Sequence, residues 1–308
     1  MKKFTSKLVF VFSLFIVVNL LFFVFLSRGG WISPIEKIKV SFFNDSIKNP
    51  IYVIAGSSMG NSFDSEFVSK KMKREVFNTS FSLAHKSSFL LNYISSNVKK
   101  GDIVVYGPEY DHYYDFDNSI SMSQSASVYN NTSFFNYLAF NQKIKFLLNI
   151  PKMNILLSYK RMKMLLKPQL FNKTTYSKRG DYIDHLKDKK TWKPSKKTRY
   201  ERNQYQHKMN MVFKENLLKS KSLIEKKGAR LFITFPPHPK SEFDKRFTID
   251  LLQFYKNTKF KLIGKPDSFV FHDSLFLNHP YHTTYSGTKK RTEIFIKNLE
   301  PFLSALDK

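Results

Sequence analysis

The sequence has 308 residues, no cysteine and a formal net charge of +27 at pH 7. The lack of cysteine excludes disulfides and thiolate metal sites. A chain of this length can bury the core of a full domain. The positive charge is concentrated between residues 141 and 230, where 25 lysines and arginines stand against six acidic residues. Such a region suits an acidic polymer or anionic lipid as partner, or is a solvated basic face without one.

The first 30 residues contain an apolar run. From residue 8 to residue 26 only Ser13 and Asn19 are polar, and no residue is charged. Nineteen helical residues rise about 28 Å, close to the hydrocarbon thickness of a bilayer. We therefore predict a transmembrane anchor over residues 8–27. A cleavable signal peptide is the alternative, but no small-x-small cleavage motif follows the run.

The charges around this run predict its orientation. Lys2, Lys3 and Lys7 precede it, so we expect a cytoplasmic N-terminus and a main domain that is periplasmic or extracellular. This topology argues against nucleic acid as a partner. The expected division of the chain is a cytoplasmic segment at 1–7, the anchor at 8–27, a linker at 28–50 and one domain at 51–308.

Beyond the linker, strand and helix patterns alternate. Apolar runs predict strands, and 3.6-residue periodicity predicts helices. The alternation is typical of an α/β domain in which right-handed helical crossovers join parallel strands. Strands are predicted at 51–55, 76–80, 102–106, 229–235 and 260–263, and helices at 59–72, 87–98, 212–227, 247–255 and 287–306.

The stretch from about 112 to 210 interrupts this pattern. It is basic, has helical patterns near 134–149 and 153–166, and is irregular and polar at 170–208. We interpret it as a basic, mainly helical insertion into the α/β domain, and it is where an acidic polymer or anionic lipid would bind.

Two turns of the predicted domain carry nucleophile and base chemistry. Ligands of open α/β sheets bind at the carboxyl ends of the strands. Ser58 follows the first predicted strand, where an exposed hydroxyl beside free helix N–H groups suits a nucleophile with an oxyanion hole. The alternative is a serine that only caps the helix. His282 precedes the last predicted helix and is either a general base or a surface histidine.

A third turn follows the predicted strand at 102–106. Glu109 and Asp111 lie in it. Their carboxylates either orient a histidine, bind a sugar hydroxyl, or are solvated loop charges.

Together these turns resemble the sequence blocks of the SGNH hydrolase superfamily, the GDSL-type esterases, and especially its membrane-anchored members among bacterial surface-polysaccharide proteins. The resemblance covers roughly 51–111 and 210–300. It implies a three-layer, flavodoxin-like α/β/α domain with a parallel sheet, and no metal or cofactor. The matching segments are Gly56-Ser57-Ser58, Asn78-Thr79-Ser80, Gly101 to Val105 with Pro108-Glu109-Tyr110, and Tyr281-His282 through Gly287 to Arg291-Thr292.

The resemblance implies a role for each matching position. Ser58 is the implied nucleophile and His282 the implied base, and the N–H groups near Met59 and Ser80 are the implied oxyanion donors. The acid of the family usually lies three or four residues before the histidine, where this sequence has His279 and Asn278.

The sequence departs from the family at the acid and at the oxyanion hole. Asn278 stands in place of the acid, and Asp273 is the nearest upstream carboxylate and the alternative acid. Ser80 replaces the glycine with which the family's second sequence block, usually Asn-x-Gly, ends; here that block is Asn78-Thr79-Ser80. Glu109 replaces an asparagine that normally donates to the oxyanion, and an ionised carboxylate only accepts hydrogen bonds.

Two functions therefore follow from the sequence. The first is an extracytoplasmic serine esterase or O-acyl (acetyl) transferase that acts on an acylated saccharide of a cell-surface glycan. The second is a catalytically degenerate protein that keeps the fold and binds glycan or scaffolds polysaccharide assembly. The missing acid and the Glu109 replacement favour the second function.

Overall fold

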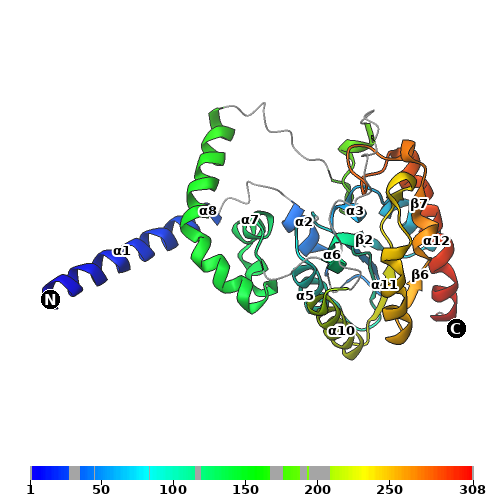
Figure 1. The fold of residues 1–308 in the computed structure, drawn as a ribbon, viewed down its shortest axis with the longest axis horizontal. Helices are drawn as coiled ribbons and strands as arrows, with labels where there is room; N and C mark the ends of the chain where they lie inside the picture. The colour runs from blue at the N-terminus through cyan, green and yellow to red at the C-terminus, as the bar shows by residue number, and fades with distance from the viewer. Residues whose placement is uncertain are drawn as a thin grey trace. The chain divides into compact units, whose positions relative to one another are not determined.

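The computed structural model describes residues 2–27, 35–44, 46–82, 84–114, 119–166, 176–187, 193 and 209–306 (Figure 1). The expected linker residues 28–34 and most of the polar stretch at 170–208 lie outside the described residues. Contacts divide the chain into two compact units. One unit is Met1–Lys37 with Asn118–Thr174, and the other is Ile38–Asp117 with Thr175–Lys308.

A parallel five-stranded sheet is the centre of the second unit. Its strand order is β2-β1-β3-β4-β6, and every neighbouring pair is parallel. This order corresponds to the flavodoxin-like arrangement 2-1-3-4-5, so the predicted parallel α/β fold is confirmed. The strands are β1 (Ile51–Ile54), β2 (Val76–Asn78), β3 (Ile103–Tyr106), β4 (Arg230–Thr234) and β6 (Lys261–Ile263).

Helices cover both faces of this sheet. α4 (Ser65–Met72) and α12 (Tyr285–Leu306) contact each other and pack over one face. α5 (Ser87–Asn97) and α10 (Met211–Lys226) pack against each other in the opposite layer, and α10 contacts β4. Because side chains alternate along a strand, the residues at 51, 53, 103 and 105 face α12.

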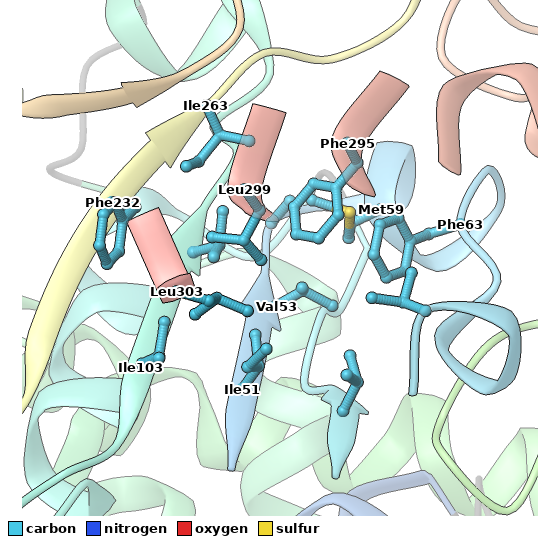
Figure 2. Close-up of a cluster of buried hydrophobic side chains, with 14 residues drawn as sticks. Ile51, Val53, Met59, Phe63, Ile103, Phe232, Ile263, Phe295, Leu299 and Leu303 are labelled. Atoms are coloured by element: carbon cyan, nitrogen blue, oxygen red, sulfur yellow. The ribbon is translucent and has the colours of Figure 1, made fainter. Parts of the chain in front are cut away.

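The direction of α12 positions the end of the chain relative to the strands. Phe295 contacts Phe63 with ring centroids 4.8 Å apart, and Figure 2 shows it beside Met59. Leu303, two turns later, lies near Ile103 in the same view. The helix therefore runs antiparallel to the strands. Its N-terminus lies at their carboxyl ends, where the loops that follow the strands also gather.

The remaining elements of the second unit are short. The helix predicted at 59–72 is two helices, because Asp64 caps a new one: its side chain accepts a hydrogen bond from the Phe67 amide at 2.9 Å. The other elements are α3 (Ser57–Gly60), α6 (Tyr110–Tyr114), η3 (Asp184–Lys187), β5 (His238–Pro239), η4 (Lys240–Glu242), α11 (Arg246–Asn257), η5 (Pro266–Phe269), β7 (Val270–Phe271) and η6 (Asp273–Leu275), while α2 (Ile35–Ser41) crosses the boundary between the units.

The first unit is helical. Within the described residues, one helix is long and apolar enough to cross a membrane, and this helix is α1 (Lys2–Ser27). The two helical patterns predicted near 134–149 and 153–166 are largely one helix, α8 (Phe140–Leu166), which contains Pro151. α7 (Met122–Asn130) and η1 (Thr132–Tyr137) precede it, and both α7 and α8 contact α1.

Candidate active site

Ser58 lies in the first turn of α3, directly after β1 and Gly56. Its side chain is fully buried. Its carbonyl oxygen accepts hydrogen bonds from the Ser62 hydroxyl and from Nη1 of Arg291. Within the described part of the chain its hydroxyl has no hydrogen-bond partner. The structure thus places a buried serine hydroxyl, unpaired among the described residues, at the carboxyl end of the sheet.

Glu109, in the turn after β3, contacts the turn that carries Ser58. It follows β3, is fully buried, and its Oε1 accepts the Ser58 backbone N–H at 2.6 Å and the Ser57 hydroxyl at 3.2 Å. Gly56 makes this approach feasible, since a Cβ there would lie 1.9 Å from Glu109 Oε2. The Glu109 carboxylate therefore occupies the Ser58 amide, next to Met59, whose neighbourhood the sequence predicted as the source of an oxyanion donor.

Two basic side chains lie near the Glu109 carboxylate. His112 Nδ1 is 3.6 Å from Oε2, and Nε2 of the same ring is 3.2 Å from the carbonyl oxygen of His85. Burial lowers the pKa of Arg291 to about 9, and the charge of Glu109 opposes this shift. A buried carboxylate costs much free energy unless charges and donors compensate it. Here the Ser58 amide and the Ser57 hydroxyl donate to Glu109, and the Arg291 guanidinium interacts with its charge.

Arg291 is a site residue whose role was not foreseen from the sequence. It is buried on α12, on the same side as Thr288, Phe295 and Leu299. Besides Ser58, it contacts the Ser62 hydroxyl and the carbonyl oxygen of Phe235 at the end of β4. The signal in the sequence was a cation within the apolar stripe of an amphipathic helix, where a charge needs buried partners.

The expected second oxyanion donor is also engaged. The Ser80 backbone N–H donates to Asn78 Oδ1 at 3.1 Å. The amide nitrogen of Asn78 donates to the carbonyl oxygen of Met59 at 3.0 Å and to Asp181 Oδ1 at 2.8 Å. The Ser80 hydroxyl is buried and has no partner among the described residues. Asn78 thus connects the segment Asn78-Thr79-Ser80 to the turn that carries Ser58.

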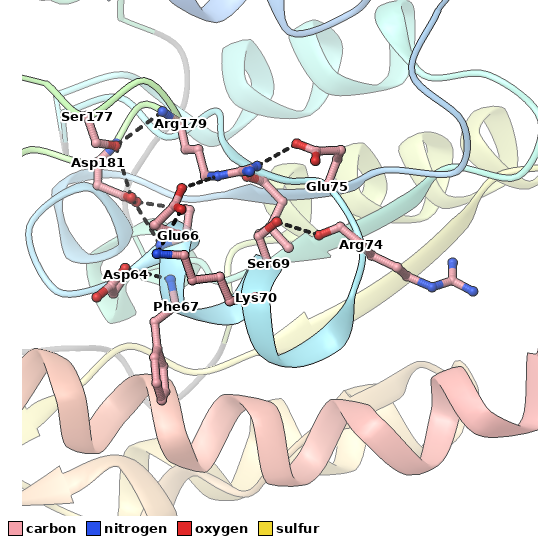
Figure 3. Close-up of polar contacts among 12 residues, drawn as sticks. Asp64, Glu66, Phe67, Ser69, Lys70, Arg74, Glu75, Ser177, Arg179 and Asp181 are labelled. Atoms are coloured by element: carbon pink, nitrogen blue, oxygen red, sulfur yellow. Dashed lines mark hydrogen bonds and ion pairs between the residues drawn. The ribbon is translucent and has the colours of Figure 1, made fainter.

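Residues 176–187 lie against α3 and α4, although they come about 100 positions later in the chain. Figure 3 shows Ser177, Arg179 and Asp181 of this segment beside α4. Asp181 is buried and accepts hydrogen bonds from the Ser65 amide and hydroxyl, and burial raises the pKa of its carboxyl group. The Tyr182 amide donates to the carbonyl oxygen of Gly60 at 2.9 Å. Arg179 bridges Glu66 and Glu75 with a contact of 2.6 Å to each. The segment therefore fixes α3 and the start of α4.

His282 lies in the loop before α12. Its Nδ1 is 3.0 Å from Oδ1 of Asn278, so the predicted base contacts the residue predicted to stand in place of the acid. Two backbone bonds hold the loop: Leu277 N to the His282 carbonyl oxygen at 2.9 Å, and Thr284 N to the Leu275 carbonyl oxygen at 2.8 Å. The loop precedes α12 and therefore lies at the same sheet edge as Ser58.

Asp273, the alternative acid, has a different contact. Its Oδ1 accepts the Ser241 amide at 3.1 Å. Within the described residues, no group of three or more His, Asp or Glu side chains is placed to hold a metal ion.

A cavity of about 430 Å³ lies beside the residue 176–187 segment. It is lined by side chains of α4 and the residues just before it, of α12 and of that segment, among them Phe63, Asp64, Phe67, Asp181, Tyr285 and Thr288.

Comparisons with known proteins give little beyond this geometry. No family model and no curated protein matches the chain. Among solved structures it is similar to the crystal structure of the Bacillus subtilis protein YxiM, with 12% sequence identity and a TM-score of 0.39. The similarity covers 82% of this chain and 56% of that one, so the chain spans little more than half the length of YxiM. These values support no inference about function.

Proposed function

We propose that the protein is a membrane-anchored serine enzyme of SGNH type that cleaves or transfers an O-acyl group, in particular acetyl, on a cell-surface glycan. The observation that carries this proposal is the buried Ser58 hydroxyl at the carboxyl end of β1, which has no partner in the part of the chain that the structure describes. The histidine loop at the same sheet edge, with Asn278 against His282 Nδ1, supplies the second component of an acyl-transfer site.

The reaction would follow the serine acyl-transfer sequence. The Ser58 oxygen attacks the ester carbonyl carbon while His282 Nε2 accepts the hydroxyl proton, and the alkoxide leaving group then takes that proton. Water or an acceptor hydroxyl attacks the acyl-enzyme and passes its own proton through His282 in the same way. Proton transfer needs a separation of about 3 Å. Because the Ser58 hydroxyl makes no hydrogen bond to any described residue, His282 must approach it when substrate binds.

Glu109 sets the main requirement of this mechanism. The Ser58 amide can stabilise an oxyanion only after the Glu109 carboxylate has released it, because both negative groups need the same N–H. The substrate must therefore displace Glu109, or the developing charge must rely on other donors.

The same contact favours a second candidate function. A carboxylate that stays on the Ser58 amide, together with a neutral Asn278 beside His282, describes a site that has lost catalysis. Such a protein would bind glycan or scaffold polysaccharide assembly through this sheet edge.

The test is an ester hydrolysis assay on the full-length chain in detergent, with p-nitrophenyl acetate and an O-acetylated glycan as substrates. We expect Ser58→Ala to abolish release of acetate. Ser95→Ala, which removes a buried serine hydroxyl on α5, serves as the matched control and should keep the wild-type rate. Equal rates for wild type and Ser58→Ala on both substrates would leave the binding protein as the remaining function.

The proposed location is tested separately. A reporter that is active only outside the cytoplasm, fused after Lys308, should be active, and a cytoplasmic reporter at the same position should be silent. The opposite pattern would overturn the orientation and, with it, the glycan substrate.

A further inference from the structure

α8 has a second apolar face that points away from its own unit. Five of its apolar side chains expose between 72% and 79% of their surface, namely Phe140, Leu148, Ile155, Leu165 and Leu166. At 3.6 residues per turn these positions fall within about 100° of the helix circumference. An apolar face of this width is not expected to remain in water, and it marks an interaction surface.

The other apolar side of α8 is already buried. Phe146, Ile150, Met153 and Leu157 are each at most 5% exposed. They are centred about 150° around the helix from the exposed face. The helix thus uses one side for packing within its unit, and its opposite side needs a different environment.

The charges of α8 indicate what that environment is. The helix has five lysines, one arginine and no acidic residue. On a helical projection, Lys145, Lys152 and Lys163 follow one border of the exposed apolar face, and Lys143 and Arg161 follow the other. Cations along both borders of an apolar face are typical of a helix that lies in the surface of an anionic membrane, with the charged ends of its side chains at the headgroups.

The contacts between α8 and α1 give the orientation. They pair Phe146 with Phe23, Asn154 with Asn19, and Arg161 with Phe25. From residue 146 to 161 α8 extends about 22 Å, whereas from 19 to 25 α1 extends only about 9 Å. The two helices therefore cross at a steep angle. With α1 across the bilayer, α8 lies along its surface.

We infer that α8 is a second membrane element, embedded in the leaflet at the C-terminal end of α1. Its exposed apolar face enters the acyl-chain region, and its cations contact anionic lipid headgroups. The commitment to lipid rather than to a protein partner rests on the charge borders, the absence of acidic residues, and the crossing of α8 over a helix fit to span a membrane. The inference is independent of the reaction at Ser58.

The cysteine-free chain permits a direct test with single spin labels. Leu148→Cys and Ile155→Cys report on the exposed face of α8. Leu14→Cys on α1 is the lipid reference, and Ile249→Cys, an exposed apolar position on α11, is the water reference. Each labelled full-length protein is placed in nanodiscs of phosphatidylcholine with phosphatidylglycerol, and collisions with oxygen and with a nickel chelate are measured by electron paramagnetic resonance.

We expect both α8 labels to show the high oxygen and low nickel accessibility of the Leu14→Cys label. A triple charge reversal, Lys145→Glu with Lys152→Glu and Lys163→Glu, should shift both labels toward the nickel-accessible value of Ile249→Cys. Labels as accessible to nickel as Ile249→Cys in the unreversed protein would overturn the inference. So would labels protected from both reagents, because that result would mean that protein covers the face.

Discussion

The Ser58 amide donates a hydrogen bond to Glu109 Oε1 across 2.6 Å, and these two residues follow neighbouring strands of the sheet. An ionised carboxylate here would have the charge that a tetrahedral intermediate develops at the same donor. In the proposed mechanism the two anions compete for the Ser58 amide, so the rate depends on how readily Glu109 is displaced.

Glu109→Gln tests this competition. The substitution keeps the size of the side chain and removes the negative charge beside the developing oxyanion. Because a single oxyanion interaction is worth about two to three orders of magnitude in kcat, we expect hydrolysis of acetyl esters to rise at least about tenfold. The rate is measured against wild type. Adding Ser58→Ala should remove the gain, and a gain that persists in this double variant would show that Ser58 is not the nucleophile.

Asn278→Asp tests the histidine partner. Asn278 Oδ1 lies 3.0 Å from His282 Nδ1, so a carboxylate there would orient the ring and stabilise its charged form. In the serine-protease triad the reverse change costs about four orders of magnitude. Because position 278 is exposed, solvent would screen the charge of the introduced aspartate. We therefore expect a smaller gain in kcat, about one to two orders of magnitude. Asp273→Asn is the control and should leave kcat unchanged, whereas a loss in that variant would make Asp273 the acid.

Arg291→Met tests the buried cation. The change leaves the carbonyl oxygen of Ser58 without a charged donor and removes a positive charge near Glu109. We expect the free energy of unfolding to fall by about 2–4 kcal/mol, as measured by chemical denaturation of the full chain in detergent. Arg230→Met, at an exposed position of β4, should change it by less than about 0.5 kcal/mol. Equal effects would mean that Arg291 contributes only its apolar stem.

His85→Gln tests a buried histidine that is neutral in the folded protein. Burial, followed by the nearby charge of Lys39, lowers its pKa to about 3 from the usual 6.5. Between pH 6.5 and about 3 the unfolded chain binds a proton at His85 that the folded chain does not bind. The free energy of unfolding therefore falls on acidification by up to about 1.4 kcal/mol per pH unit.

The measurement is the thermal midpoint of the full chain at several pH values between about 6.5 and 4, where the group titrates in the unfolded state. We expect His85→Gln to flatten the decline. His272→Gln, at an exposed position, should leave the decline as steep as in wild type. A decline of wild-type steepness in His85→Gln would assign it to other groups.

The strands were predictable because their residues alternate between two apolar layers and so read as short continuous apolar runs, as in Ile51–Ile54 and Ile103–Tyr106. The helix predicted at 59–72 was wrong as one element, because Asp64 caps a new helix inside it. Periodicity alone does not register such a cap.

The candidate site was predictable only in part. The resemblance implied that Glu109 stands in place of a donor, but the hydrogen bond from the Ser58 amide depends on how closely β1 and β3 bring the two turns together. The packing of residues 176–187 beside the site depends on hydrogen bonds from Ser65 and Asn78 to Asp181, which is more than 100 positions away from both. No local pattern encodes such contacts.

The position of Asp181 limits how this chain can be shortened. The residues from 175 onward belong by their contacts to the sheet-containing unit, although the charge pattern groups them with the basic region. Excision of 112–210 would remove the carboxylate that holds Ser65 and Asn78. A deletion confined to 119–174 would keep it, so a soluble derivative designed for assays should preserve everything from Thr175 onward.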